Sequence, residues 1–102
     1  MQNFKIDPRE LEELCVRNRI SRLALFGSVL RDDFGPKSDV DVLVEFEENI
    51  AIGLFQYARI AHEISEKFFL GRRVDLVTYN GLKPIIKPII LSEAKVQYEK
   101  AA

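Results

Sequence analysis

The sequence predicts an α/β domain in which helices flank a small β-sheet. Residues 8–18 and 53–69 have the three- and four-residue apolar spacing of amphipathic helices. Residues 20–26, 40–46 and 73–78 are short, largely apolar runs with the length and composition of strands. Because helical and strand patterns alternate, we expect the helices and the sheet to share one core.

The first helix has a clear starting signal. Asp7 is a capping residue, Pro8 fits the first helical position, and Glu10 stands three residues after the cap. The apolar face of this helix, which we expect to pack on the sheet, consists of Leu11, Leu14 and Cys15.

The first two strands are separated by a polar loop. Residues 20–26 end in an apolar run typical of a central strand, and Gly35 and Pro36 punctuate the loop before residues 40–46. A connection of this length permits antiparallel or mixed pairing, so these residues leave the pairing open.

The second half of the chain adds one long helix, a strand and a proline-rich segment. Gly71 is expected to end the helix of residues 53–69. Pro84 and Pro88 lie in the apolar stretch that follows the third strand, which predicts a short or distorted helix that starts near Pro84, with a break at Pro88 left open. Residues 95–99 are expected to form a short edge strand.

Composition limits the classes of protein that fit. The 102 residues make one domain, residues 1–102, of which 47% are hydrophobic and 30% charged. With 15 basic and 16 acidic residues the net charge is −1, so no general attraction to nucleic acid is expected and a free-standing polymerase is disfavoured.

The single cysteine and the short apolar runs indicate the cellular compartment in which the protein is expected. Cys15 has no second cysteine to form a disulfide with, and we expect it to be a small buried residue in a reducing compartment. The N-terminus lacks a signal peptide, and no apolar run approaches the roughly 18 residues of a membrane span. We therefore expect a cytoplasmic protein with no membrane contact.

Two aspartates open the second strand. Asp39 and Asp41 are two residues apart, so their side chains share one face of the strand while Val40 and Val42 point to the other. Their backbone anchors are expected about 6.6 Å apart, which suits carboxylates that bind metal ions roughly 3.5 to 4 Å apart. Two like charges directed at one place favour a cation between them.

Gly27 and Ser28 end the first strand and favour a phosphate site. A glycine directly after an apolar strand lets a ligand approach the backbone closely. A serine there can cap the next helical turn while its hydroxyl and the free amides face an anion. A phosphate site and metal-binding carboxylates are thus both expected within the 22 residues from Leu25 to Phe46.

The motif of Gly27, Ser28, ten residues, Asp39, Val40 and Asp41 resembles the signature of the DNA polymerase beta-like nucleotidyltransferases. Further residues make the chain most similar to the minimal nucleotidyltransferases of prokaryotes: Arg31, Asp33, Ser38 and the short length. The resemblance implies a polymerase beta-like fold with a small mixed sheet, and it makes Asp75 the third acidic residue. One departure is Asp32, where the family often has a small residue.

The resemblance also implies a reaction and its site. Asp39, Asp41 and Asp75 would be the catalytic residues and would bind two Mg²⁺ ions, with ATP as the expected nucleotide. The residues expected to bind the nucleotide are Gly27, Ser28, Arg31 and Ser38. For Arg31, contact with the partner and simple solvation remain alternatives.

Members of this group are typically antitoxins of HEPN-domain ribonucleases. We therefore expect AMP transfer from ATP to a hydroxyl of a HEPN toxin, with no direct nucleic-acid binding and with homo-oligomerisation left open. Two alternatives are an antitoxin that acts by steric binding without catalysis and a small-molecule nucleotidyltransferase whose acceptor site is completed by dimerisation.

Overall fold

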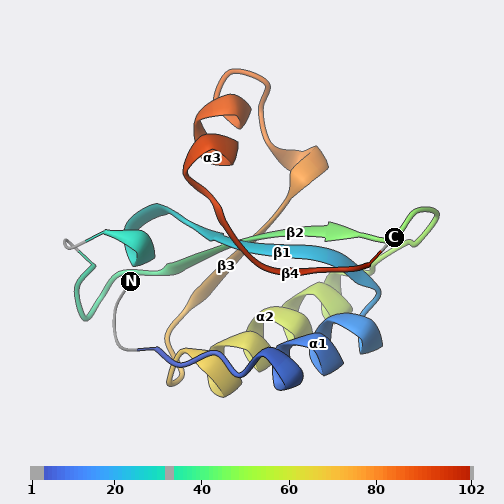
Figure 1. Ribbon diagram of the computed structural model, residues 1–102, viewed down its shortest axis with the longest axis horizontal. Helices are drawn as coiled ribbons and strands as arrows, with labels where there is room; N and C mark the ends of the chain where they lie inside the picture. Colours follow the sequence, from blue (N-terminus) through green and yellow to red (C-terminus); the bar gives the residue numbers. More distant parts are fainter. Residues whose placement is uncertain (1–3, 32–33, 102) are drawn as a thin grey trace.

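A computed structural model describes residues 4–31 and 34–101, and it confirms an α/β architecture (Figure 1). The helices are α1 (Pro8–Arg17), α2 (Leu54–Phe68) and α3 (Lys87–Glu93). The strands are β1 (Ile20–Phe26), β2 (Val40–Phe46), β3 (Val74–Thr78) and β4 (Lys95–Glu99). Short 3₁₀ turns, η1 (Gly27–Leu30) and η2 (Tyr79–Gly81), follow β1 and β3. The three strands and two longer helices lie within one residue of their expected bounds.

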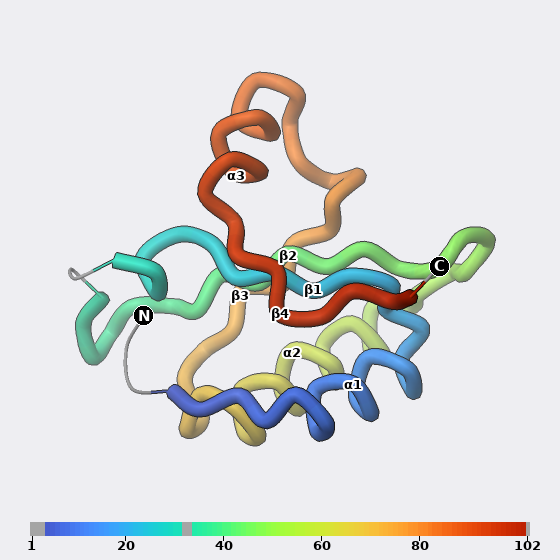
Figure 2. Tube along the Cα trace, viewed as in Figure 1, coloured from blue at the N-terminus to red at the C-terminus, as the bar shows by residue number. Residues whose placement is uncertain are grey.

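The four strands form one mixed sheet in the order β3-β2-β1-β4. Strand β1 pairs antiparallel with both β2 and β4, whereas β2 and β3 run parallel. Parallel neighbours need a crossover connection, and α2 supplies it between β2 and β3 (Figure 2). The expected edge strand at residues 95–99 is confirmed as β4.

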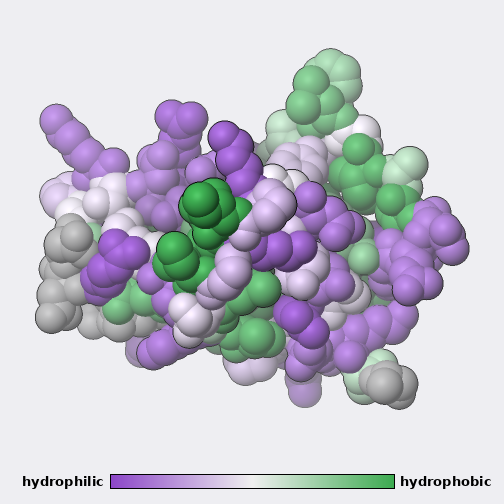
Figure 3. Space-filling model, turned by 90° about the horizontal axis from the view of Figure 1, so that it is seen from above, coloured by the Kyte–Doolittle hydropathy of each residue, from purple (hydrophilic) through white to green (hydrophobic). Residues whose placement is uncertain are grey.

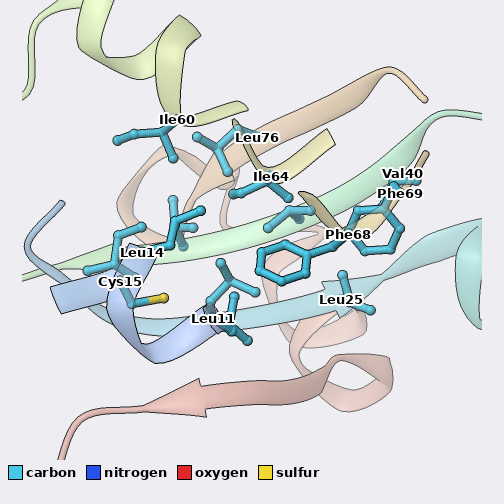
Figure 4. Close-up of a cluster of buried hydrophobic side chains, with 14 of the residues drawn as sticks. Leu11, Leu14, Cys15, Leu25, Val40, Ile60, Ile64, Phe68, Phe69 and Leu76 are labelled. Carbon is cyan, nitrogen blue, oxygen red and sulfur yellow. The ribbon is translucent and has the colours of Figure 1, made fainter. Parts of the chain in front are cut away.

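Helices α1 and α2 lie side by side against one face of the sheet (Figure 1). Asp7 caps α1 by accepting a hydrogen bond from the Arg9 amide at 2.9 Å, and a proline occupies the first turn. The main core lies between these helices and the sheet. Figure 4 labels some of its members: Leu11, Leu14, Cys15, Leu25, Val40, Ile60, Ile64, Phe68, Phe69 and Leu76. Burial raises the pKa of Cys15 to about 12, which fits the expected packing role.

The other face of the sheet carries the segment from η2 through α3. It is anchored by a smaller buried cluster of Ala24, Phe26, Leu43 and Leu82. Pro88 does not break a helix that has begun at Pro84, because residues 84–86 form a turn and α3 begins at Lys87 with Pro88 in its first turn. Proline is tolerated there since the first-turn amides have no helical acceptor.

Hydrophobic side chains of this segment reach the surface. Ile85 is 82% exposed and Ile89 is 64% exposed. Seen from the side of α3, hydrophobic surface gathers among hydrophilic neighbours (Figure 3). Within residues 4–31 and 34–101, no helix combines the length and hydrophobicity needed to span a membrane.

Candidate active site

Asp39 and Asp41 lie on the sheet face opposite α1 and α2. Strand alternation directs Val40 and Val42 into the helix-side core, where both are fully buried, so Asp41 points to the other face. Asp39 directly precedes β2 and shares that face by the same two-residue period. The expected common orientation of the two aspartates therefore follows from the burial of the valines.

Asp75 stands beside Asp41. In the parallel pairing of β2 with β3, Asp41 and Asp75 are direct partners, and the Val40 amide donates to the Arg73 carbonyl at 2.9 Å. Neighbouring strands lie about 4.8 Å apart, so the two carboxylates leave the same face from adjacent backbones. The prediction that Asp75 shares a sheet face with the other aspartates is confirmed by this pairing.

The pKa of Asp41 is raised by its surroundings. Partial burial is the main cause that raises its pKa, and the negative charges of Asp75 and Asp39 raise it further. Arg31 opposes the shift, while Glu93 adds to it. A half-buried carboxylate among other carboxylates lowers folding stability, and a cation between them would relieve the repulsion.

Gly27 brings the backbone of η1 against the same carboxylate. Phe26, the residue before it, pairs with Asp41 across β1 and β2. Gly27 has φ +77°, and a Cβ at this position would collide with the Asp41 carboxylate. Only glycine fits this close approach without strain, so a buried backbone amide lies next to the acidic group.

Ser28 lies within the 3₁₀ turn, and Arg31 directly follows it as its C-cap. The Arg31 amide donates to the Ser28 carbonyl at 2.9 Å, which closes the turn and holds both residues near the end of β1. The Arg31 guanidinium is half exposed and lies 3.6 Å from a carboxylate oxygen of Glu93. Arg31 therefore contributes positive charge at the Gly27 end of the site.

Ser38 has a structural role in the loop before β2. Its hydroxyl accepts a hydrogen bond from the Gly35 amide at 3.0 Å, and its own amide donates to the Gly35 carbonyl at 3.1 Å. These two bonds close the turn that leads into Asp39. Asp32 and Asp33, which the family comparison singled out, lie outside the described residues.

The two arginines before β3 differ in what they contact. Arg72 donates to the Gly35 carbonyl at 2.6 Å and lies over the Phe34 ring, 4.5 Å from its centroid. Arg73 is 84% exposed at its side chain and lies 3.9 Å from an oxygen of Asp39. Arg72 thus holds the loop before Asp39 in place, while Arg73 adds an exposed positive charge beside Asp39.

Glu93 is a site residue that the sequence did not reveal. Its carboxylate accepts a hydrogen bond from the Gly27 amide at 3.1 Å, although the two residues are 66 positions apart. No local motif marks this glutamate, because only the pairing of β4 with β1 brings it to the end of β1. An acidic residue just before the predicted edge strand was the one signal available.

The aspartates suit Mg²⁺, whose preferred ligands are carboxylate oxygens. In the part of the chain that the structure describes, no three His, Cys, Asp or Glu side chains converge closely enough to enclose a metal ion by themselves. Mg²⁺ in phosphate-transfer sites usually takes one or two carboxylates together with waters and substrate phosphates. An open group of carboxylates beside a backbone amide fits that mode of binding.

Comparison with known proteins agrees with this geometry. Residues 9–96 match the nucleotidyltransferase domain family. A Methanocaldococcus jannaschii protein, provisionally named a protein adenylyltransferase, is 36% identical over 86 residues, which cover 84% of this chain and 88% of the relative. The protein adenylyltransferase MntA of Thermococcus cleftensis is 38% identical over 82 residues, covering 80% and 79%.

Solved structures share the fold. A structure provisionally described as a minimal nucleotidyltransferase superposes with a TM-score of 0.69 at 36% identity and covers 86% of each chain. A toxin-antitoxin structure with AMP-PNP has a TM-score of 0.70 at 18% identity, covering 93% of this chain and 75% of that one. A tri-AMPylated Shewanella oneidensis HEPN toxin in complex with its MNT antitoxin gives 0.62 at 18% identity, covering 91% and 70%.

The last two similarities concern the fold alone, whereas the family match spans most of the sequence. The expected resemblance and the polymerase beta-like mixed sheet are both confirmed. The chain therefore belongs to the nucleotidyltransferase domain family and is a nucleotidyltransferase enzyme.

Proposed function

We propose that this enzyme transfers AMP from ATP to a hydroxyl of a partner protein and releases pyrophosphate. The partner we propose is a HEPN ribonuclease toxin, which the transfer neutralises. The observation that carries the proposal is the register of Asp41 with Asp75 beside the buried Gly27 amide. This proximity of a backbone amide to two carboxylates at one end of one sheet face supports the proposed binding of phosphate and metal there.

The first role belongs to the turn after β1. The Gly27 amide is a donor that no Cβ shields, and the amide and hydroxyl of Ser28 follow it directly. Backbone donors of this kind bind phosphate oxygens and fix their orientation. In the proposed complex they hold the β and γ phosphates of ATP, while the half-exposed Arg31 neutralises part of their charge.

The second role belongs to the carboxylates. Asp39 and Asp41 would hold one Mg²⁺ with the triphosphate, and Asp75 would help to hold a second. Two such ions, when bound, supply charge neutralisation for the attacking and leaving oxygens of an in-line displacement. Asp75 is the exposed member of the Asp41–Asp75 pair, so it is the carboxylate that a hydroxyl from another protein can reach.

The acceptor is proposed from relatives and from the surface. The Thermococcus cleftensis relative is named a protein adenylyltransferase, and structural neighbours are toxin-antitoxin complexes, one with an AMPylated HEPN toxin. The net charge of −1 gives no general attraction to a nucleic-acid acceptor. The exposed Ile85 and Ile89 offer apolar surface of the kind that proteins bind.

Label transfer tests the proposal. The enzyme is incubated with its partner toxin, Mg²⁺ and ATP labelled at either the α or the γ phosphate, and protein bands are examined for retained label. We expect the α label on the toxin, no γ label, and loss of the α label in Asp41→Asn. Glu45→Gln is the matched control, because Glu45 lies on the same face of β2 at its far end. Transfer that persists in an Asp39→Asn, Asp41→Asn double variant would refute the carboxylate mechanism.

A steric antitoxin is the second candidate, and the same apolar surface favours it. Such a protein would silence the toxin by covering it, without needing the aspartates. The two candidates differ in whether the Asp39→Asn, Asp41→Asn variant still silences the toxin. Retention of silencing with no label transfer would favour the steric function, and loss of both would favour adenylylation.

A further inference from the structure

Glu93 occupies the position that the proposed function gives to a nucleotide phosphate. One of its carboxylate oxygens, Oε1, accepts the Gly27 hydrogen bond at 3.1 Å and lies 3.6 Å from the Arg31 guanidinium. Both partners belong to the group expected to bind phosphate. The carboxylate thus presents an anionic oxygen to the same donors that an ATP phosphate would use.

The backbone fixes Glu93 in this place. In the antiparallel pairing of β1 with β4, Leu25 is the partner of Lys95. Gly27 follows Leu25 by two residues at the start of η1, and Glu93 precedes Lys95 by two residues at the end of α3, so this pairing brings the two residues close together. The Ala94 amide also donates to the Ile90 carbonyl at 2.9 Å, which ends α3 directly beside the proposed phosphate cradle, which consists of the donors of Gly27 and Arg31.

Glu93 and a bound triphosphate exclude each other in two ways. A single amide hydrogen cannot make a short, linear bond to two anionic oxygens, so the Gly27 donor serves either the carboxylate or the phosphate. Glu93 also adds negative charge to a group that already contains Asp41, Asp39 and Asp75. A triphosphate entering beside it would meet like-charge repulsion at close range.

We propose that Glu93 is a built-in anion that fills the phosphate cradle in the nucleotide-free enzyme, and that ATP binds only when Glu93 leaves Gly27 and Arg31. This inference rests on the proposed function, because it takes the Gly27 turn as the phosphate site. Glu93 thereby preserves the orientation of the Gly27 amide and Arg31 in the empty enzyme. The cost is competition with ATP, so Glu93 sets the affinity for nucleotide.

Nucleotide affinity of Glu93→Gln tests the proposal directly. Titration calorimetry measures the dissociation constant of Mg²⁺-ATP, and of inorganic tripolyphosphate as a probe without a base or sugar. We expect Glu93→Gln to bind both about tenfold more tightly, since a charge-assisted contact is replaced by a weaker neutral one and repulsion is removed. Glu99→Gln removes the same charge from β4 at the Arg22 end of the sheet, and it should leave affinity unchanged.

A second readout follows the contact itself. In a ¹⁵N–¹H spectrum without nucleotide, the Gly27 amide signal of Glu93→Gln should lie upfield of the wild-type signal, because the charged acceptor is lost. In the wild type, the Gly27 signal should also move on addition of ATP, because ATP replaces the carboxylate. A Gly27 signal that is the same in wild type and Glu93→Gln would overturn the inference. Thermal denaturation of each variant checks that the fold is intact.

The outcomes separate this inference from the proposed function. One outcome is that the wild type binds Mg²⁺-ATP, Asp41→Asn does not, and Glu93→Gln binds it with equal or weaker affinity. This outcome would overturn the inference and leave the proposed function standing. Failure of both wild type and Glu93→Gln to bind Mg²⁺-ATP would overturn both. Tighter binding of Mg²⁺-ATP by Glu93→Gln, with unchanged affinity in Glu99→Gln, supports the inference that ATP displaces the Glu93 carboxylate.

Discussion

Asp41 and Asp75 are direct partners across the parallel strands β2 and β3, and the Asp41 carboxylate also fills the space above Gly27. Two acidic side chains on adjacent strands repel one another when nothing lies between them. Here the repulsion is increased by partial burial of Asp41. Such a pair lowers folding stability, and the proposed Mg²⁺ ions would relieve the repulsion when bound.

The variant Asp41→Asn separates these two effects. We expect AMP transfer to fall by at least about 100-fold, the size of effect seen when one group that stabilises transition-state charge is removed. The free energy of unfolding at neutral pH should stay the same or rise, because the amide has similar volume and no charge. Urea denaturation and label transfer measure the two quantities. A marked fall in stability would mean that the carboxylate holds the fold together.

The pH dependence of stability offers an independent check on Asp41. Its pKa is raised above the ordinary value of 3.8 in the folded state, so the folded protein binds this proton more tightly than the unfolded chain does. Its contribution is therefore fully present below about pH 3.8 and is lost as the pH rises through the folded pKa. Relative to Asp41→Asn, wild type should lose stability between about pH 4 and neutrality. An opposite trend in paired thermal melts would contradict the burial of this carboxylate.

Gly27→Ala tests the close approach of the backbone to Asp41. A side chain here is strained at φ +77° and collides with the carboxylate, so we expect a loss of about 1–3 kcal/mol in stability and a loss of ATP binding. Gly71→Ala is the matched control, because Gly71 has φ +82° while its added Cβ would come no closer than 3.5 Å to the Glu66 side chain. It carries the backbone strain without the collision, so it should lower stability by a smaller amount and leave ATP affinity unchanged. Equal loss of binding in both variants would show that strain alone is responsible.

Local sequence patterns were sufficient for the strands and for the orientation of the first two aspartates. Asp39 and Asp41 share a face because Val40 and Val42 must be buried, and that alternation is visible in the sequence. The pairing of Asp75 could not be predicted from local sequence patterns. Its pairing with Asp41 depends on how α2 docks as a crossover, and only the family resemblance indicated it.

The roles of Ser38 and Glu93 show where local patterns fail. Ser38 stands beside the aspartates in the sequence, yet its hydroxyl accepts from the Gly35 amide and closes a turn. Glu93 is remote in the sequence, yet the pairing of β4 with β1 delivers it to Gly27. The Ser38 contact is a local turn between residues three apart, whereas the position of Glu93 follows from strand register, which a one-residue shift would change completely.

Arg72 links the loop before Asp39 to the start of β3, and Arg72→Lys tests this link. Lysine keeps the charge but loses the planar group that lies over the Phe34 ring and donates to Gly35. We expect a loss of about 1–2 kcal/mol in the free energy of unfolding. Arg73→Lys, whose side chain is 84% exposed, should change it by less than about 0.5 kcal/mol. Equal effects of the two variants in urea denaturation would show that the Arg72 contacts carry no stability.

Glu63 joins α2 to α1 and should give a pH dependence opposite in sign to that of Asp41. The Arg17 guanidinium donates to both of its carboxylate oxygens, at 3.0 and 2.9 Å. Hydrogen bonding from Arg17 is the main cause that lowers the pKa of Glu63 below its ordinary value of 4.5, and Lys67 adds to the effect. Its stabilisation is therefore present above about pH 4.5 and is lost as the pH falls through the folded pKa.

At neutral pH we expect Glu63→Gln to lose about 0.5–1 kcal/mol, near the upper range for a surface pair because the geometry is bidentate. The deficit should shrink as the pH is lowered below 4.5. A double-mutant cycle with Arg17→Gln isolates the pair, and its coupling energy should fall with added salt because both side chains are solvent-accessible. A coupling energy near zero at low ionic strength would show that the packing of Leu11, Leu14, Ile60 and Ile64 alone holds α1 beside α2.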